Sequence, residues 1–367
     1  MKKLIAILAL AMVLITVLSS CVSRRPGDGE ETTKDLNQIL DEIKQDMEND
    51  GMEGDDVVAE VIYKAYDDHA EVVGCELPMG AVEILAEFEG KAVTKIADNA
   101  FQGMNSITSI VLPDSVVSIG EKAFMSCVAL TSVKMPAGLK TIGRYAFYGC
   151  VALSSIEVGA SVESVGENAF GSCVAMTAIS VADGNGNFVA DDGVLFSKDM
   201  TTLVQYPTGK SNLSYTIPAS VKTVSNFAFS YAKSLKVIDT GKVTSLGDYT
   251  FSSCAALEEV KLSDALTYIG AGTFQKCTAL VRIDIPEGVT ALGYKNDAGT
   301  ECGASFLGCT ALTNVSLPST LKNIYLRSFD GCEMLSQVSY NGTKAEWEKV
   351  VIGEDNEPLQ SLGVVTK

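Results

Sequence analysis

The chain has 367 residues with 46 acidic and 28 basic side chains, so its formal net charge is −18 at pH 7. Non-specific binding to nucleic acid needs positive charge, and we therefore expect no nucleic-acid partner. Ten cysteines accompany a single histidine and form no C-x-x-C pair, so the usual zinc-site spacings are absent. We expect no metal and no cofactor.

The first 20 residues have the pattern of an export signal. Lys2 and Lys3 precede an apolar run, residues 4–17, that is shorter than the about 20 apolar residues of a membrane-spanning helix. The next four residues, LSSC, resemble the bacterial lipobox, which implies that Cys21 becomes the lipidated first residue of the mature protein. The alternative is an ordinary secretory signal with an incidental cysteine. We predict a signal peptide over 1–20 and an exported, surface-exposed lipoprotein of the cell membrane or outer membrane, because several acyl chains anchor a protein stably.

An acidic stretch follows a flexible tether at 21–34. Residues 28–68 contain 15 acidic and 3 basic side chains, and their apolar residues recur at helical spacing: Leu36, Ile39, Leu40, Ile43 and Met47. We predict an acidic helical segment over 35–68, with Asp35 as the N-cap of its first helix and a second helix over about 56–65. The alternative is a flexible acidic linker with only transient helix.

From residue 69 to residue 337 the chain repeats itself. Phenylalanines return at mostly even intervals, at positions 101, 124, 147, 170, 229, 251, 274, 306 and 329. A fixed period in the range of about 20 to 30 residues indicates a solenoid, in which each unit is too short to bury its own apolar face and shares a core with its neighbours. Extra residues before the unit at 306 predict a loop insert at 295–304.

Within each unit the apolar residues fall at fixed distances from the phenylalanine. Positions six and nine after it are apolar in every unit, and positions nine and eleven alternate with polar neighbours, which is strand periodicity. Prolines such as Pro113 then end the strand, and glycines such as Gly120 favour a second corner. We predict a β-rich solenoid with short helical or 3-10 turns.

Seven cysteines share one position, three residues after the phenylalanine: Cys127, Cys150, Cys173, Cys254, Cys277, Cys309 and Cys332. Stacked strands lie about 4.8 Å apart, so neighbouring thiols could approach bonding range, and a disulfide ladder remains open. Cysteine also behaves as a small buried hydrophobe, and we predict that these thiols are free and interior. Cys75 and Cys302 fall outside the ladder.

The unit VSIGEKAFMSCVALTSVKMP, residues 117–136, resembles the BspA-like leucine-rich repeat family of bacterial surface proteins. Residues 191–224 and 338–359 are similar to an insert and a closing cap of that family. The resemblance implies an α/β leucine-rich-repeat solenoid over 69–337, with a hairpin insert at 183–215 and a C-terminal cap at 338–367.

Positions eight and ten after each phenylalanine should face outward from the strand. They are mostly small and polar near both ends of the repeat region, whereas three middle units carry both charges: Asp239, Glu259, Lys261, Arg282 and Asp284. Extended surfaces of repeat solenoids commonly bind partners, so we predict a partner-binding site at these five residues. The alternative is a solvated strand face without a ligand.

No nucleophile-elbow, phosphate-loop or zinc-protease motif occurs in the sequence, so we predict no catalytic residues. The resemblance implies a membrane-anchored scaffold for adhesion or another protein interaction, with a host or neighbouring-cell surface or matrix protein as partner. A glycan- or nutrient-capture lipoprotein is the alternative, but it needs exposed aromatic side chains that the outward strand positions lack. An enzyme is the least favoured interpretation, and the oligomeric state stays open.

Overall fold

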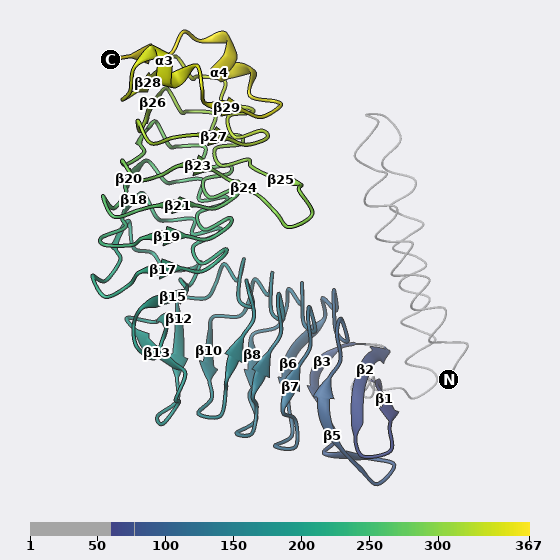
Figure 1. Cartoon of the computed structure of the whole chain (residues 1–367). Helices are drawn as coiled ribbons and strands as arrows, with labels where there is room; N and C mark the ends of the chain where they lie inside the picture. Colours follow the sequence, from purple (N-terminus) through teal and green to yellow (C-terminus); the bar gives the residue numbers. More distant parts are fainter. Residues whose placement is uncertain (1–59, 77) are drawn as a thin grey trace, which may run out of the picture. The chain divides into compact units, whose positions relative to one another are not determined.

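The computed structural model describes residues 60–76 and 78–367 (Figure 1). The predicted signal peptide, the tether, Cys21 and residues 35–59 of the predicted helical segment lie outside the described residues. In the two described ranges, no helix is both long and apolar enough to cross a membrane.

The described chain begins with a β-hairpin. β1 (Glu60–Ala65) pairs antiparallel with β2 (Ala70–Glu76), so the helical segment predicted over 35–68 is wrong in residues 60–65. Exposed and half-buried residues alternate along β1, and Val61 and Tyr63 pack against the core. Alternation of exposed and covered side chains with a period of two residues favours a strand over a helix. The acidic residues nearby do not prevent strand formation.

Each repeat contributes one longer strand, and these strands pair in parallel with equivalent positions side by side, as Ile110 does with Val133. The first run of repeats has β3 (Gly80–Glu83), β6 (Ile107–Val111), β8 (Ser132–Lys134), β10 (Ser155–Val158) and β12 (Ala178–Val181). The second run has β16 (Ser214–Thr216), β18 (Val237–Asp239), β20 (Glu259–Lys261), β22 (Arg282–Asp284), β26 (Asn314–Leu317), β28 (Gln337–Tyr340) and the last strand, β30 (Val365–Thr366).

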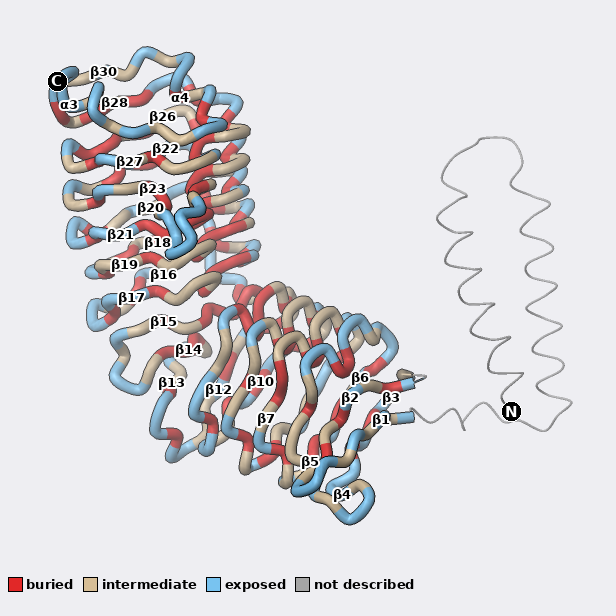
Figure 2. The backbone as a smooth tube through the Cα atoms, turned by 45° about the vertical axis from the view of Figure 1, so that its right-hand side comes forward, coloured by how far each residue is buried: buried red, intermediate tan, exposed pale blue. Residues whose placement is uncertain are grey.

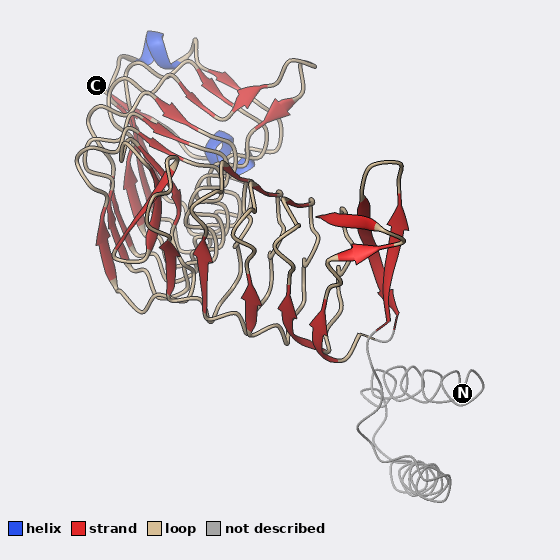
Figure 3. Cartoon of the chain, turned by 90° about the horizontal axis from the view of Figure 1, so that it is seen from below, coloured by secondary structure: helices blue, strands red, loops and turns tan. Residues whose placement is uncertain are grey.

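A second ladder of mostly shorter strands closes the other side of the repeats. In the first run it comprises β5 (Lys91–Ile96), with β4 (Glu87–Phe88) at its edge, and β7 (Ser118–Ile119), β9 (Thr141–Ile142) and β11 (Ser164–Val165). In the second run it comprises β15 (Thr202–Gln205), β17 (Thr223–Val224), β19 (Ser245–Leu246), β21 (Tyr268–Ile269), β23 (Ala291–Leu292), β27 (Asn323–Ile324) and β29 (Val351–Ile352). Strands and loops therefore make up nearly all of the described chain (Figure 3).

The segments that carry the phenylalanines are hydrogen-bonded turns and not continuous helices. They keep single hydrogen bonds of the 3-10 type, as from the Cys127 amide to the Phe124 carbonyl at 3.2 Å. In one such corner the amides of Phe124 and Ser126 donate to the carbonyls of Ala146 and Tyr148 in the next turn, both at 2.7 Å. Lys122 and Ser126, two residues before and after the phenylalanine, have φ angles of 56° and 61°. Left-handed residues at this spacing interrupt a helix and release alternate amides to the neighbouring turn.

The predicted interior of the solenoid is confirmed. All nine repeat phenylalanines are at most 1% exposed, and ring centroids of neighbours in each run lie between 5.0 and 5.9 Å apart. The seven ladder cysteines are free and buried, as predicted. Each thiol also donates to the carbonyl of the phenylalanine one turn earlier, as Cys150 does to Phe124 at 3.1 Å. The ladder cysteine is thus a small apolar group with one polar contact.

An insert lies between the two runs, where the direction of stacking changes (Figure 2). β13 (Phe188–Asp191), β14 (Val194–Ser197) and β15 form an antiparallel meander within it. Tyr206 precedes Phe229 by one repeat, stacks on that ring at 4.8 Å and donates its amide to Ala228 at 2.8 Å. Tyr206 is therefore the anchor of a repeat that the search for phenylalanine missed.

Two local structures depart from the repeat in the second run. β24 (Tyr294–Lys295) and β25 (Glu301–Cys302) form a hairpin that projects from the stack (Figure 1). After β28, the helices α3 (Lys344–Trp347) and α4 (Glu357–Ser361) lie over the last turn. A capping box between Thr343 and Glu346 starts α3.

Candidate functional site

The five charged residues predicted as a partner site lie on β18, β20 and β22, in three consecutive turns. Asp239 and Lys261 are register partners on β18 and β20, and the Lys261 Nζ lies 2.8 Å from the Asp239 Oδ2. Arg282 and Asp284 lie on one strand, 2.9 Å apart. Glu259 is exposed on β20. The structure thus brings the charges together as two separate ion pairs, and β20 and β22 belong to different hydrogen-bonded sheets.

Both members of the first pair stay charged near neutral pH. The hydrogen bond from Lys261 lowers the pKa of Asp239, and the same contact raises the pKa of Lys261. Such pairs add little to stability when they face solvent, and the Lys261 and Arg282 side chains are 73% and 69% exposed. The arrangement suits non-covalent recognition of a complementary surface.

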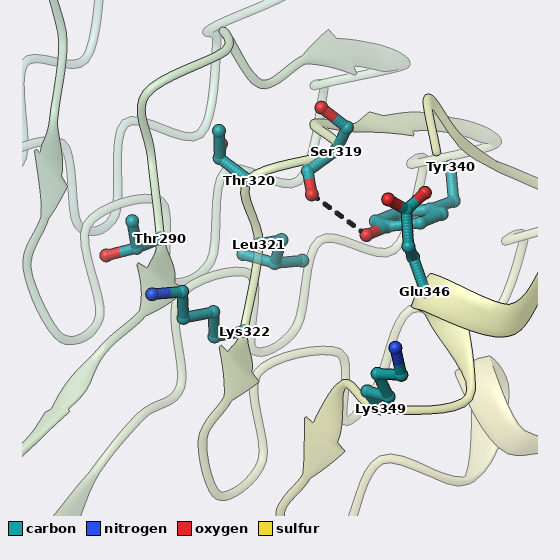
Figure 4. A pocket seen from close by; sticks show the side chains of 8 residues that line it. All are labelled: Thr290, Ser319, Thr320, Leu321, Lys322, Tyr340, Glu346 and Lys349. Carbon is teal, nitrogen blue, oxygen red and sulfur yellow. Dashed lines mark hydrogen bonds between the residues drawn. The ribbon is translucent and has the colours of Figure 1, made fainter. Parts of the chain in front are cut away.

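A shallow pocket of about 330 Å³ lies near the C-terminal cap, with Lys322 on one side and Lys349 on the other (Figure 4). The Tyr340 hydroxyl crosses it and donates to the Ser319 carbonyl at 3.0 Å. The Glu346 carboxylate at its rim accepts the capping hydrogen bonds that start α3. These polar groups are occupied by contacts that hold the cap, so the pocket has a structural explanation.

Two features of residues 60–76 and 78–367 bear on catalysis and metal binding: the single histidine and the arrangement of possible metal ligands. His69, the single histidine, sits after the β1–β2 turn, with its Nδ1 2.7 Å from Asp68 and its Nε2 3.3 Å from Glu71. The hydrogen bond to Asp68 is the main reason that its pKa is raised. Within the same residues, no three His, Cys, Asp or Glu side chains are placed to hold a metal ion.

The structure also shows a surface that the sequence pattern did not predict, which we call the corner aromatic cluster: Tyr145, Tyr148, Phe227, Tyr231 and Tyr249. Each of these residues lies within two positions of a buried phenylalanine, at the outer side of the corners. Tyr145 and Phe227 are 6.0 Å apart, and Phe227 stacks on Tyr249 at 5.0 Å. Burial, followed by the neighbouring Tyr231, raises the pKa of Tyr148. The sequence signal that could have predicted this cluster is the occurrence of aromatic residues within two positions of the repeat phenylalanines.

Two parallel strand ladders, a stacked phenylalanine interior and a short repeat period define a leucine-rich-repeat solenoid. The BspA-type leucine-rich repeat model matches the chain in six copies over residues 93–190, 208–302 and 301–350. These matches cover more than half of the chain, and the protein belongs to this family.

Solved structures of bacterial leucine-rich repeat proteins share the fold. One from Eubacterium ventriosum is 26% identical with a TM-score of 0.60, and the match covers 75% of this chain and 82% of that one. The pneumococcal vaccine antigen PcpA is 21% identical with a TM-score of 0.53, and the match covers 84% of this chain and 96% of that one. No curated protein matches the chain in sequence.

Proposed function

We propose that this chain is a membrane-anchored scaffold on a bacterial surface that binds another protein, in adhesion or a related contact. Membership of the BspA-type family supports a role in protein interaction rather than catalysis. The partner is a surface or matrix protein of a host or a neighbouring cell.

The observation that carries the proposal is the contrast between inward and outward strand positions. Inward, equivalent residues such as Ile238 and Val260 are all apolar. Outward, the same strands vary from repeat to repeat: β20 and β22 each carry exposed charges of both signs, and β18 carries the half-buried Asp239. A scaffold needs its interior for folding, whereas its outer strand positions can vary to fit a partner. Charges there would set the register of the complex and accelerate encounter.

A binding assay with a triple variant tests the strand face. The full chain is tested against a panel of purified surface and matrix proteins, beside the variant Glu259→Ser, Lys261→Ser, Arg282→Ser. We expect the melting temperature to change by only a few degrees, because the side chains are exposed. Lost binding with an unchanged fold would place the partner on this face. Retained affinity would move the site elsewhere on the solenoid.

The anchor is proposed at Cys21, which lies outside the described residues. Replacing Cys21 by alanine should release the protein from membranes, because the remaining short apolar segment is a poor membrane span. Fractionation without detergent, followed by immunoblotting, measures the release. A variant that remains wholly in the membrane fraction would exclude lipidation as the anchor.

A further inference from the structure

The first strand of the described chain, β1, is an edge strand. It ends a seven-stranded sheet, pairs only with β2 among the described residues and lies at the N-terminal end of the first run (Figure 1). β1 has six residues, whereas β7, β9 and β11 of the same sheet have two each. A long edge strand presents a row of backbone N–H and C=O groups that another strand can pair with.

The outward face of β1 has an apolar centre between an acid and a base. Glu60, Ile62 and Lys64 are exposed, and the residues between them are half-buried toward the core. Ile62 is 38% exposed, and its register partner on β2 is Gly74, which has no side chain to cover it. The exposed Val73 precedes this glycine at a bulge of β2. The edge therefore combines an uncovered apolar residue with opposite charges on either side.

Glu60, at one end of this face, lies opposite another acid. Its register partner on β2 is Glu76, and both residues are exposed. Like charges directly opposite each other destabilise an antiparallel pair. Neither carboxylate has an ion-pair partner within 4.0 Å among residues 60–76 and 78–367. A cation supplied from the open side of β1 would relieve this repulsion.

Lys64, at the other end, has an acid nearby that is already engaged. Its register partner Glu71 contacts Lys95 and His69 instead, both at 3.3 Å. The Lys64 Nζ lies 4.8 Å from the centre of the Tyr66 ring, which is a cation–π contact. An anion supplied from the open side of β1 would therefore meet an ammonium group that has no carboxylate partner in the described chain.

A second copy of β1 supplies both charges when the two strands pair antiparallel about Ile62. Ile62 then lies opposite its own copy, and Glu60 of each chain lies opposite Lys64 of the other. On the inner face, Val61 lies opposite Tyr63. Apolar pairs and opposite-charge pairs across strands both stabilise a sheet, and a two-fold axis makes each of these pairs twice.

Other arrangements of two β1 strands do not pair both charges. An antiparallel pair centred on Tyr63 places Lys64 opposite Ile62 and leaves Glu60 beyond the partner strand. A parallel pair with equivalent residues side by side sets each charge against its own copy. Edge strands that avoid association commonly carry charges, but opposite signs at equal distances from Ile62 attract across a two-fold axis instead of repelling. The charge pattern thus favours one register.

We propose that β1 is a self-association edge at which a second copy of this chain docks antiparallel, with the two-fold axis at Ile62. The two seven-stranded sheets then form one continuous sheet. In such strand addition, backbone hydrogen bonds supply affinity and side chains set the register. This inference goes beyond the proposed function and does not depend on the partner proposed there.

The net charge of the chain sets the conditions of the test. Residues 60–367 contain 34 acidic and 22 basic side chains, so each copy has a net charge of −12 there, and two copies repel at low ionic strength. At about 0.15 M salt the Debye length is about 8 Å, so contacts at the strand edge determine whether the copies associate.

Sedimentation velocity at that salt concentration measures the association. The full chain is used in a mild detergent and carries Cys21→Ala, so that no acyl chain contributes. We expect a dimer that forms with increasing concentration. Glu60→Lys and Lys64→Glu each set like charges against each other twice, and each should weaken the dimer tenfold or more, about the effect of a lost interfacial charge pair.

An equimolar mixture of these two single variants tests the register directly. In the mixed pair, two basic residues of one chain face two acidic residues of the other, so a heterodimer should form although each variant alone is weakened. Labelling one variant with a fluorophore identifies the heterodimer. The double variant Glu60→Lys, Lys64→Glu should also dimerise, because the two charges have only exchanged places.

A matched control makes the same charge change elsewhere. Lys134→Glu, at an exposed position of β8, should dimerise like the parent protein, and thermal melts check that every variant is folded. A parent protein that stays monomeric at all concentrations would overturn the inference. So would single variants that dimerise normally, or a mixture that does not recover the dimer. Oligomers larger than a dimer would contradict the closed two-fold contact.

Discussion

The turn anchored on Phe147 and the turn anchored on Tyr206 occupy equivalent places in the solenoid. The Phe147 amide donates to the carbonyl of Ala169 at 2.8 Å, and the Tyr206 amide donates to that of Ala228 at the same distance. Both rings are buried and stack on the ring of a neighbouring turn. Each turn therefore places a buried aromatic ring at the anchor position, together with a backbone amide that donates to the following turn.

The two turns differ in how they treat polar atoms. In the regular turn, the residue three after the anchor is Cys150, which donates its thiol to the previous turn. The equivalent residue of the insert turn is Gly209, where a Cβ would lie 2.6 Å from the Met176 carbonyl oxygen. The Tyr206 hydroxyl is buried without a hydrogen-bond partner. Ring stacking and backbone bonds therefore set the register, while the polar contacts of each turn depend on its neighbours.

High pH should affect the regular turns most and produce the largest loss of stability. Burial raises the pKa of Cys127 and Cys254 from 9.0 to about 12. Above pH 9 the unfolded chain loses thiol protons that the folded chain keeps, so the free energy of unfolding falls by up to about 1.4 kcal/mol per pH unit and thiol. Below pH 9 this stabilisation is fully present. Melting curves under reducing conditions should therefore shift steeply downward between pH 9 and 11, and a constant melting temperature would contradict the buried thiol ladder.

Removing an anchor ring should be the most damaging single substitution. We expect Phe147→Ala to lower the free energy of unfolding by about 2–5 kcal/mol, the range for large-to-small core changes, and Leu153→Ala to fall in the same range. Cys150→Ala is the matched control in the same turn and should cost much less, because it removes one small group with a weak hydrogen bond. Urea unfolding measures all three, and an unchanged Phe147→Ala protein would mean that the repeat register is wrong.

Making the insert turn resemble a regular turn should fail at Gly209. A cysteine there would place its Cβ within 3 Å of three backbone atoms of residues 174–176, and overpacking of this kind costs about 1–3 kcal/mol. We expect Gly209→Cys to melt at a lower temperature than the parent protein. Gly186→Ser, at an open position of the same insert without a positive φ angle, tests whether loss of glycine alone accounts for the effect, and equal losses in the two variants would contradict the steric explanation.

Replacing the anchor Tyr206 by the phenylalanine of a regular turn should instead raise stability, and it should give the smallest change in the free energy of unfolding. Tyr206→Phe removes a hydroxyl group that is buried without a partner, and an unsatisfied polar group costs about 1–3 kcal/mol. We expect a gain of about 1 kcal/mol in the free energy of unfolding, since the ring keeps its stacking on Phe229. Calorimetry of the two proteins decides the sign, and a destabilised variant would indicate that the hydroxyl has a favourable contact.

The same two turns show how far the sequence predicts this molecule. The period, the inward positions and the thiol ladder were predictable, because the interior of each turn needs the same shapes at the same height. Tyr206 was not, because the insert lengthens the interval between Phe170 and Tyr206 and hides its unit. The strand β1 was missed because its alternating pattern is short and lies within an acidic stretch.

The candidate sites were harder to predict than the fold. Asp239 and Lys261 were expected on neighbouring strands and lie there, but their direct pairing depends on side-chain conformations that a repeat pattern does not specify. The corner aromatic cluster depends on residues with positive φ angles at the corners. It also depends on the contact between the Phe147 corner and the Phe229 corner. Neither property follows from the repeat period alone.

The backbone hydrogen bonds between the corners of successive turns also determine how the molecule would respond to a pulling force. Each turn is held mainly by its two neighbours, through the amides that the corner donates and the strand pairs beside it. Tension applied to the C-terminal end would therefore peel one turn at a time from the stack. Each step would release roughly 80 Å of extended chain for a unit of about 23 residues. A protein held at one end and loaded at the other would lengthen in steps and dissipate work at each of them.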